Sequence, residues 1–90
     1  MTESLLTEFR GRVVVIDVQS MFVYVGTLSG FDPLHLELTA ADVHDLRDSN
    51  TSREKYVIES KTLGVRSNRK RVVVRREQVV SVSLLDDVIE

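Results

Sequence analysis

The sequence predicts a mainly β protein, a small and strongly bent five-stranded barrel with a helix at its N-terminus. Runs of β-branched residues such as "RVVVIDV" (12–18) and "VVSVSL" (79–84) recur along the chain, and such runs favour strands. Gly26 interrupts one of these runs, which is typical of the sharply curved sheets of small barrels. A chain of 90 residues is long enough for one domain with a modest core, so we expect residues 1–90 to form a single domain.

The N-terminal segment has the pattern of a short helix. Thr2 suits the N-cap position of this helix. Leu5, Leu6 and Phe9 follow with helical spacing, and Gly11 is well placed to end the helix.

Five short strands are expected. They span residues 12–18, 21–28, 35–46, 71–75 and 79–84. A turn from Gly30 to Pro33 joins the second strand to the third, because Asp32 can accept backbone hydrogen bonds there and Pro33 fixes its own φ. Gln78 is expected at a tight turn between the last two strands. Five short strands in a strongly bent sheet indicate a small open barrel of the SH3-like or OB-like kind.

An insertion of about residues 47–69 separates the third strand from the fourth. Thr51 and Glu54 match a capping box, and Gly64 suits a helix end. A helix over about residues 52–63 would place Tyr56 and Leu63 on one face, seven positions apart. The segment "KYVIES" (55–60) also fits a strand, so the sequence leaves both structures open.

The composition excludes several classes of protein. The chain has no cysteine, which excludes disulfides, thiolate nucleophiles and cysteine-based zinc sites. No apolar run approaches the roughly 20 residues of a membrane span, and no secretory signal is evident, so we expect a cytoplasmic protein away from membranes. No catalytic motif is present, so we expect neither an enzyme nor a cofactor. Asp42, His44 and Asp45 offer too few donors for a metal site.

The charges are distributed unevenly along the chain. The net charge is -2, yet residues 60–76 contain no acid and seven cations. Four of these cations, Arg66, Arg69, Lys70 and Arg71, form a candidate basic patch. The patch would bind polyanion phosphates in a salt-dependent way, stay solvated, or pair with acids of a neighbouring copy. No aromatic residue interrupts the run, which weakens a base-stacking role.

Three stretches share the motifs of one known family. They are "FRGRVVVIDV" (9–18), "YVGTLSGFD…LHLEL" (24–38) and "VVVRREQVVSVSL" (72–84). Gly26, Leu28, Phe31, Asp32, Leu36 and Leu38 match the family's first motif, and Val74, Arg75, Val79, Val80 and Val82 match the second. On these residues the chain resembles a divergent member of the Sm and Sm-like (LSm) family, which includes the bacterial Sm-like RNA chaperones. The resemblance covers nearly the whole chain apart from about residues 45–69.

The resemblance implies a homo-oligomeric ring in which neighbouring copies pair the fourth strand against the fifth. Such pairing would also protect runs like "RVVV" and "VVSVSL", which are prone to aggregation as free edges.

The resemblance also implies a site for single-stranded RNA, read by stacking and by contacts with base edges. Leu34 stands where relatives have the stacking aromatic residue, and His35 stands at their asparagine position. Arg75 of the second motif is kept, but Arg76 replaces the glycine that follows it. With Asp32 shaping the turn, these residues are the candidate RNA site, although His35 also fits a merely exposed strand position.

Two functions from different classes therefore follow from the sequence. One is RNA binding by a ring with an altered base pocket. The other is a homo-oligomeric scaffold that binds protein and no nucleic acid, which the altered motif residues and the acidic net charge favour.

Overall fold

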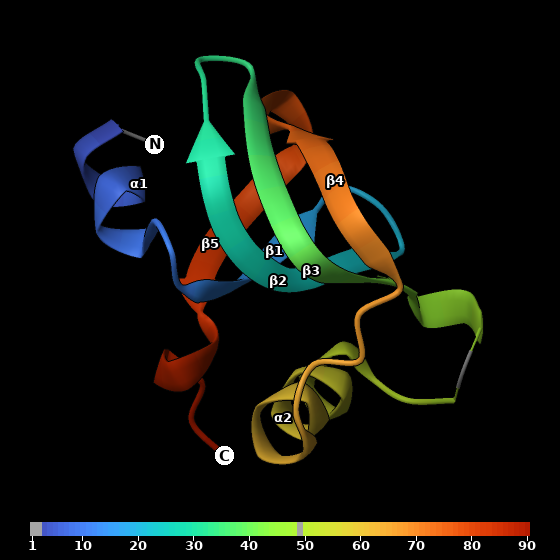
Figure 1. The fold of residues 1–90 in the computed structure, drawn as a ribbon. Helices are drawn as coiled ribbons and strands as arrows, with labels where there is room; N and C mark the ends of the chain where they lie inside the picture. Colours follow the sequence, from blue (N-terminus) through green and yellow to red (C-terminus); the bar gives the residue numbers. More distant parts are fainter. Residues whose placement is uncertain (1–2, 49) are drawn as a thin grey trace.

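A computed structural model describes residues 3–48 and 50–90, so Thr2, the expected N-cap, lies outside the described residues. The described chain begins with α1 (Glu3–Phe9) and continues into one five-stranded sheet (Figure 1). The strands are β1 (Val13–Val18), β2 (Phe22–Phe31), β3 (His35–Asp45), β4 (Arg69–Arg75) and β5 (Val79–Leu84). Neighbouring strands are antiparallel, in the order β4-β3-β2-β1-β5. The predicted mainly β fold with an N-terminal helix is confirmed.

Two strands are longer than the sequence predicted. Strand β2 continues past the expected end at Leu28, because a register shift there lets pairing resume between Gly30 and Glu37. The turn to β3 is therefore shorter than the predicted one from Gly30 to Pro33, and only three residues separate the two strands. Strand β4 begins at Arg69 rather than residue 71, since Arg69 pairs with Ala41 of β3.

The sheet bends where β2 and β3 approach each other most closely. A Cβ atom on Gly26 would lie 2.9 Å from both Cα and Cβ of Ala41 and 3.2 Å from the carbonyl oxygen of Thr39. The β2–β3 register shifts at the same place, and Ala40 has a φ of 47°. The expectation that Gly26 marks a bend or a close backbone approach is confirmed.

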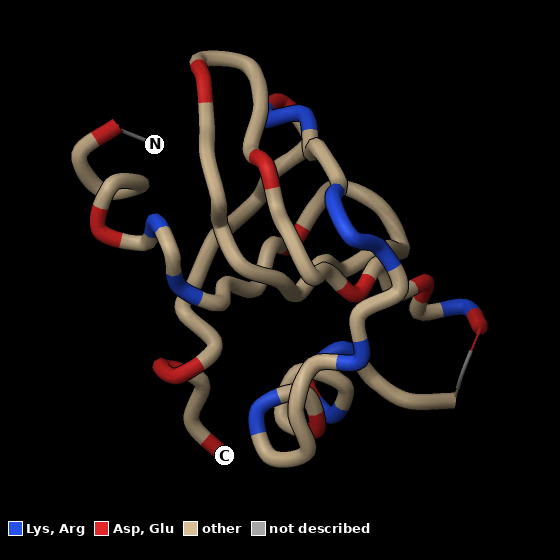
Figure 2. The backbone as a smooth tube through the Cα atoms, viewed as in Figure 1, with Lys and Arg blue, Asp and Glu red and all other residues tan. Residues whose placement is uncertain are grey.

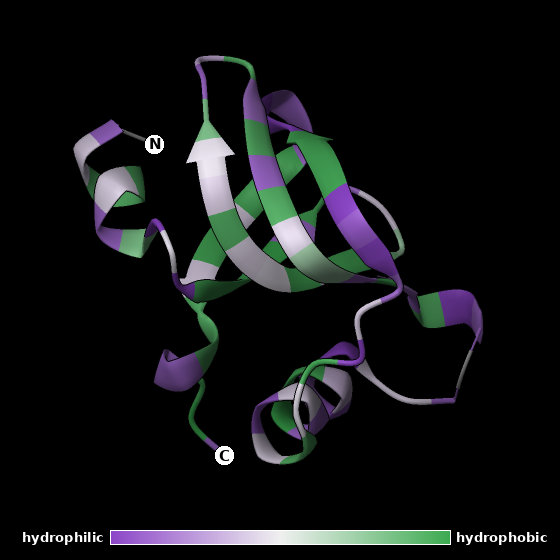
Figure 3. Cartoon of the chain, in the orientation of Figure 1, coloured by the Kyte–Doolittle hydropathy of each residue, from purple (hydrophilic) through white to green (hydrophobic). Residues whose placement is uncertain are grey.

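The larger core cluster lies inside the bent sheet and takes residues from every strand. Leu6 of α1 closes it, with 1% of its surface exposed. The other buried members are Val14, Ile16, Val18, Leu28, Leu36, Leu38, Ala41, Val74 and Leu84. Figure 3 shows the matching alternation of hydrophobic and hydrophilic residues along β3. These positions have the period of two that a strand with one buried face requires.

A second apolar cluster covers the opposite face of the sheet. Val15, Val23 and Val25 of β1 and β2 pack there against Tyr56 and Val57 of a second helix, α2 (Arg53–Leu63). Leu85 of the 3-10 turn η3 (Leu85–Asp87) completes the buried part of this cluster. The insertion therefore folds back onto its own sheet, below it in Figure 1, and buries that face.

The insertion is helical, although its details differ from the prediction. Ser52 is the N-cap, because its hydroxyl accepts the Lys55 N–H at 3.2 Å; the predicted cap at Thr51 and its capping box with Glu54 are wrong by one residue. The face toward the sheet contains Tyr56, Val57 and Ser60, whereas Leu63 is 74% exposed. Leu63 lines the same cavity as Tyr56 and Ser60, so it lies on the predicted side of the helix, but it is not packed into the core.

The end of α2 is as predicted. Gly64 follows the last helical residue with a φ of 92°, a conformation that favours glycine. No helix in residues 3–48 or 50–90 combines the length and apolar character needed to cross a membrane.

The last two strands are joined by a tight turn that contains Gln78, as predicted, but they do not pair with each other. The 3-10 turn η2 (Arg76–Gln78) joins β4 to β5, but β4 pairs with β3 and β5 pairs with β1. The turn reverses the direction of the chain and takes it from one edge of the sheet to the other. Within the described residues, β4 and β5 are thus the two edges of the sheet, each with one side open.

Candidate functional site

The β2–β3 turn is held by the carboxylate of Asp32. Its Oδ1 accepts the backbone N–H groups of Leu34 at 2.8 Å and His35 at 2.7 Å, and lies 3.1 Å from Nδ1 of His35. The bond from the Leu34 N–H is the main cause that lowers the pKa of Asp32. Asp32 therefore fixes both the turn and the orientation of the His35 imidazole.

This turn lies beside the β4–β5 connection. His35 and Arg75 are direct cross-strand partners, and the Arg76 N–H donates to the Leu34 carbonyl at 2.9 Å. The side chains of His35 and Arg75 are 44% and 70% exposed. A shallow cavity of about 370 Å³ lies between the two connections, lined by Pro33, Leu34, His35, Arg75, Arg76 and Glu77. The structure thus brings the predicted RNA-site residues together at one end of the barrel.

Arg76, unlike Arg75, is not an exposed cation. Its side chain is only 13% exposed, and Nη1 donates to the Asp32 carbonyl at 2.6 Å and to Glu3 Oε1 at 2.7 Å. Arg76 therefore links η2, the β2–β3 turn and α1. The bulky side chain at the glycine position of the motif acts here as a bridge between elements.

Both arginines of the site pair with a carboxylate. Arg75 forms an ion pair with Glu77 two residues later. Glu3 meets the site from α1 although it lies 73 residues before Arg76. The sequence reasoning did not assign a role to either acid; the spacing of Arg75 and Glu77 is a local signal, but nothing in the sequence indicates the Glu3 contact.

A second cavity of about 370 Å³ lies on the other side of His35. It is lined by Gly30, Phe31, Asp32, His35, Glu37, Arg71 and Val73. Glu37 accepts a hydrogen bond from the Ser29 hydroxyl at 2.9 Å and pairs with Arg71 at 2.5 Å. These two contacts, the serine bond first, lower the pKa of Glu37. His35 therefore lines both of these shallow cavities.

The predicted basic patch is not a uniform cationic surface. Figure 2 shows its blue segments along β4 and the chain just before it. Arg71 is neutralised by Glu37, and the Arg69 guanidinium donates to the Asn68 carbonyl at 3.1 Å. Arg66 lines a different cavity, under α2, while Lys70 has no ion pair or hydrogen bond with the described residues. The four cations therefore act in different surroundings.

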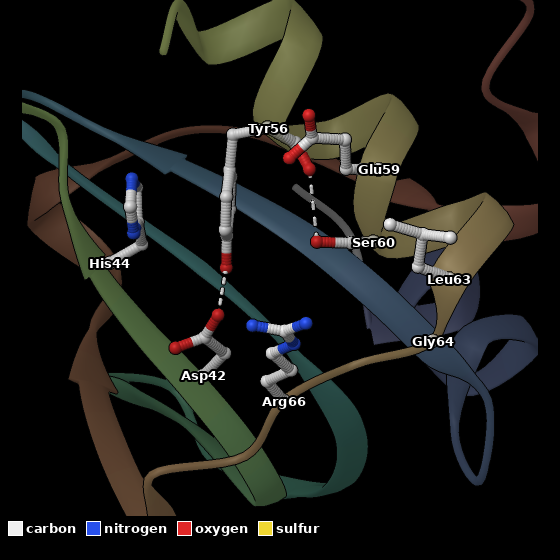
Figure 4. A pocket seen from close by; sticks show the side chains of 8 residues that line it. All are labelled: Asp42, His44, Tyr56, Glu59, Ser60, Leu63, Gly64 and Arg66. Atoms are coloured by element: carbon white, nitrogen blue, oxygen red, sulfur yellow. Dashed lines mark hydrogen bonds between the residues drawn. The ribbon is translucent and has the colours of Figure 1, made fainter. Parts of the chain in front are cut away.

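The cavity under α2 has a volume of about 270 Å³ (Figure 4). Its lining is Asp42, His44, Tyr56, Glu59, Ser60, Leu63, Gly64 and Arg66. The rings of His44 and Tyr56 stack with centroids 4.0 Å apart and planes 7° from parallel. The Tyr56 hydroxyl donates to Asp42 Oδ2 at 2.5 Å, and burial raises the pKa of this tyrosine. These contacts join α2 to β3.

Asp42, His44 and Asp45, the residues weighed as metal ligands, contact other side chains in the structure. Asp42 bonds to Tyr56 and to the Asn68 amide, while Asp45 binds Arg47 through both oxygens at 2.9 and 2.7 Å. Among residues 3–48 and 50–90, no group of three or more acids and histidines is arranged to hold a metal ion. The sequence placed Tyr56 on one face of the helix, but nothing in it indicated the contacts of Tyr56 with Asp42 and His44.

Comparison with known proteins shows which solved structures share this fold. No protein-family model matches the chain, and no curated protein matches it by sequence. Among solved structures, the Sm protein of Pyrococcus abyssi, determined in complex with a uridine heptamer, superposes with a TM-score of 0.65. That match covers 93% of this chain and 97% of the other. The chain has an Sm-like fold.

The Sm-like fold is divergent in sequence. Identity with the Pyrococcus abyssi protein is 16%. A conserved hypothetical protein from Pyrococcus furiosus is 26% identical, with a TM-score of 0.52 over 91% of this chain and 94% of the other. The motif resemblance thus predicted the fold correctly, whereas these likenesses do not test the individual residues of the site.

Proposed function

We propose that this Sm-like protein is a subunit of a homo-oligomeric ring that binds single-stranded RNA where the β2–β3 turn meets the β4–β5 connection. The observation that carries the proposal is the exposed cross-strand pair of His35 and Arg75 beside a cavity of about 370 Å³. The uridine heptamer bound by the Sm protein of similar fold supports RNA as the ligand class.

Each part of the site has a separate task in this proposal. The planar imidazole of His35 and guanidinium of Arg75 stack on bases or bond to base edges and phosphates. Leu34, which is 69% exposed, contacts a base face in place of an aromatic ring. Asp32 and Arg76 act indirectly, because their bonds hold the turn and η2 in position.

The acids of the site limit how strongly it binds a polyanion. Arg75 is the single well-exposed cation of the group, and Glu77 already pairs with it. Neutralisation of about one phosphate per subunit predicts a slope of log K against log salt of about -0.7 per subunit. Affinity is therefore expected to depend mainly on stacking and on the number of subunits that contact one strand.

The open edges support the ring. In the described part of the chain, β4 and β5 each have one side without a strand partner, and both are rich in valine. Edge strands of this kind are covered in soluble proteins or pair with another chain. Pairing of β4 with β5 of the next copy removes both open edges at once.

A homo-oligomeric scaffold that binds protein and no RNA is the second candidate. The observation that favours it is that each of the two arginines already pairs with a carboxylate, Arg76 with Glu3 and Arg75 with Glu77. These acids repel phosphates and occupy the cations that an RNA site would use.

Two measurements distinguish the candidates. The mass in solution is determined first, and labelled oligo-U and oligo-A are then titrated at low and moderate salt. RNA binding through this site requires that His35→Ala and Arg75→Ala weaken binding, while Lys55→Ala, a loss of one positive charge on α2, leaves it unchanged. An assembled protein that binds neither oligonucleotide at low salt would instead support the scaffold, and a monomeric mass would refute the ring.

A further inference from the structure

Opposite charges lie at the start of β4 and just beyond the end of β5, two places that would meet in an assembly. We propose that the cations at the start of β4, Arg69 and Lys70, bind the acids that follow β5 of a neighbouring copy, Asp86 and Asp87. The proposal rests on the ring proposed above and assigns part of the basic run to contacts between subunits. The partner is a second copy of this chain.

The cations are available for such a contact. Both residues are exposed at the start of the β4 edge. Arg69 bonds to the neighbouring Asn68 carbonyl, and Lys70 contacts no acid among the described residues. Arg71, the next residue, is excluded because it already pairs with Glu37.

The acids are exposed on a segment that is itself held firmly. Asp86 and Asp87 lie in η3, directly after β5, where the buried side chains of Leu84 and Leu85 anchor the chain. Lys61 of α2 donates to the Asp86 carbonyl at 3.2 Å. The Asp86 side chain is 83% exposed and lies 3.7 Å from Arg12, while the Asp87 carboxylate has no bond to a described residue.

The direction of the strands decides which ends meet. In Figure 1, β4 runs up to η2 and β5 runs down from it, so the two edges point in opposite directions. We take β5 of a second copy to lie antiparallel to β4, as every pair of neighbouring strands in the sheet does, so that the seven and six residues overlap. The start of β4 then meets the end of β5 and the two aspartates beyond it.

The same arrangement covers exposed valines. Val73, 42% exposed, is near the end of β4, and Val80, 65% exposed, is near the start of β5. Antiparallel pairing brings these two close together and buries them. Parallel pairing would place Lys70 near Val80 and leave the aspartates far from Arg69, so it matches neither the apolar nor the charged residues.

The cations of residues 60–76 therefore have different functions in this proposal. Arg69 and Lys70 serve assembly, and Arg75 remains for the RNA site. Exposed ion pairs each change an association constant by only about two- to fivefold, but every interface of a ring repeats them. Assembly is therefore expected to weaken as salt screens the charges.

Charge reversal tests the proposal, with assembly followed by light scattering over a range of protein concentrations. Lys70→Glu and Asp87→Lys are each expected to raise the concentration at half-assembly by tenfold or more. An equimolar mixture of the two variants, or both changes in one chain, restores assembly because opposite charges again face each other. Lys55→Glu, which makes the same charge change on α2, is expected to assemble like the wild type.

The outcomes separate this inference from the ring itself. If the wild type assembles and the two single reversals assemble equally well, the ring stands and the charge contact is refuted. The contact is refuted likewise if the reversals weaken assembly but neither the mixture nor the double variant restores it. A wild type that stays monomeric at every concentration refutes the ring, and this inference with it.

Discussion

Replacing Gly26 by alanine is expected to destabilise the protein by an amount that follows from the approach of β2 to β3. The added Cβ would lie 2.9 Å from Cα and Cβ of Ala41, and 3.2 Å from the Thr39 carbonyl oxygen. Ordinary contacts of this kind begin at 3.4 Å, so the strands must separate by roughly 0.5 Å (3.4 − 2.9). The atoms in the way belong mainly to the backbone, which does not rotate aside as a long side chain does.

Overpacking of this kind costs about 1–3 kcal/mol, and the reduced entropy of the unfolded chain returns part of it. We expect a net loss of about 2 kcal/mol in the free energy of unfolding. For a domain of this size, that loss corresponds to a decrease of about 8–16 °C in the midpoint of thermal unfolding.

Gly30→Ala is the matched control in the same strand. A Cβ there would meet nothing closer than Glu37 Oε1 at 3.8 Å, and the φ of Gly30 is not positive. We expect no loss, or a gain of about 0.5 kcal/mol. Urea unfolding followed by circular dichroism compares the variants at one protein concentration, because assembly also stabilises the folded state. Equal stability of the two alanine variants would refute the close-approach argument.

Three further changes test contacts outside this bend. Tyr56→Phe removes the phenol that donates to a β3 carboxylate, and is expected to cost about 1–2 kcal/mol in urea unfolding; Tyr24→Phe, whose hydroxyl bonds to no described residue, should cost less. Ser52→Ala removes the side-chain cap of α2 and should lower the free energy of unfolding by about 1 kcal/mol; an unchanged midpoint would contradict the cap. Asp45 has a pKa lowered to about 2 by its hydrogen bonds with Arg47, below its unfolded value of about 4. Its contribution is therefore present above pH 4 and lost as the pH falls toward 2, so Asp45→Asn should flatten the acid side of the stability profile.

Local patterns predicted the strands and the core well. Leu28, Leu36 and Leu38, which match the first motif of the family, are all fully buried. Gly26 and Gly64 were predicted correctly because each reports a backbone requirement that few other residues meet. The N-cap of α2 was misplaced by one residue, because adjacent hydroxyl residues give nearly the same local signal.

The candidate site was predictable in part. The motif resemblance identified His35 and Arg75, and the structure makes them cross-strand partners. The environment of these residues was not predictable, because Glu3 reaches Arg76 across 73 residues of sequence. An arginine in the place of a glycine indicated an added cation, yet its guanidinium is bonded and mostly buried.

The sequence by itself determined which segments are strands, where the chain bends and which residues enter the core. Those properties depend on side-chain shape and on alternation over a few neighbouring residues. The tertiary structure alone decided that β4 and β5 are opposite edges, that α2 covers the second face of the sheet, and which charges remain without partners. These outcomes depend on contacts between segments far apart in the chain, and a charge acquires its role only from the groups that folding places beside it.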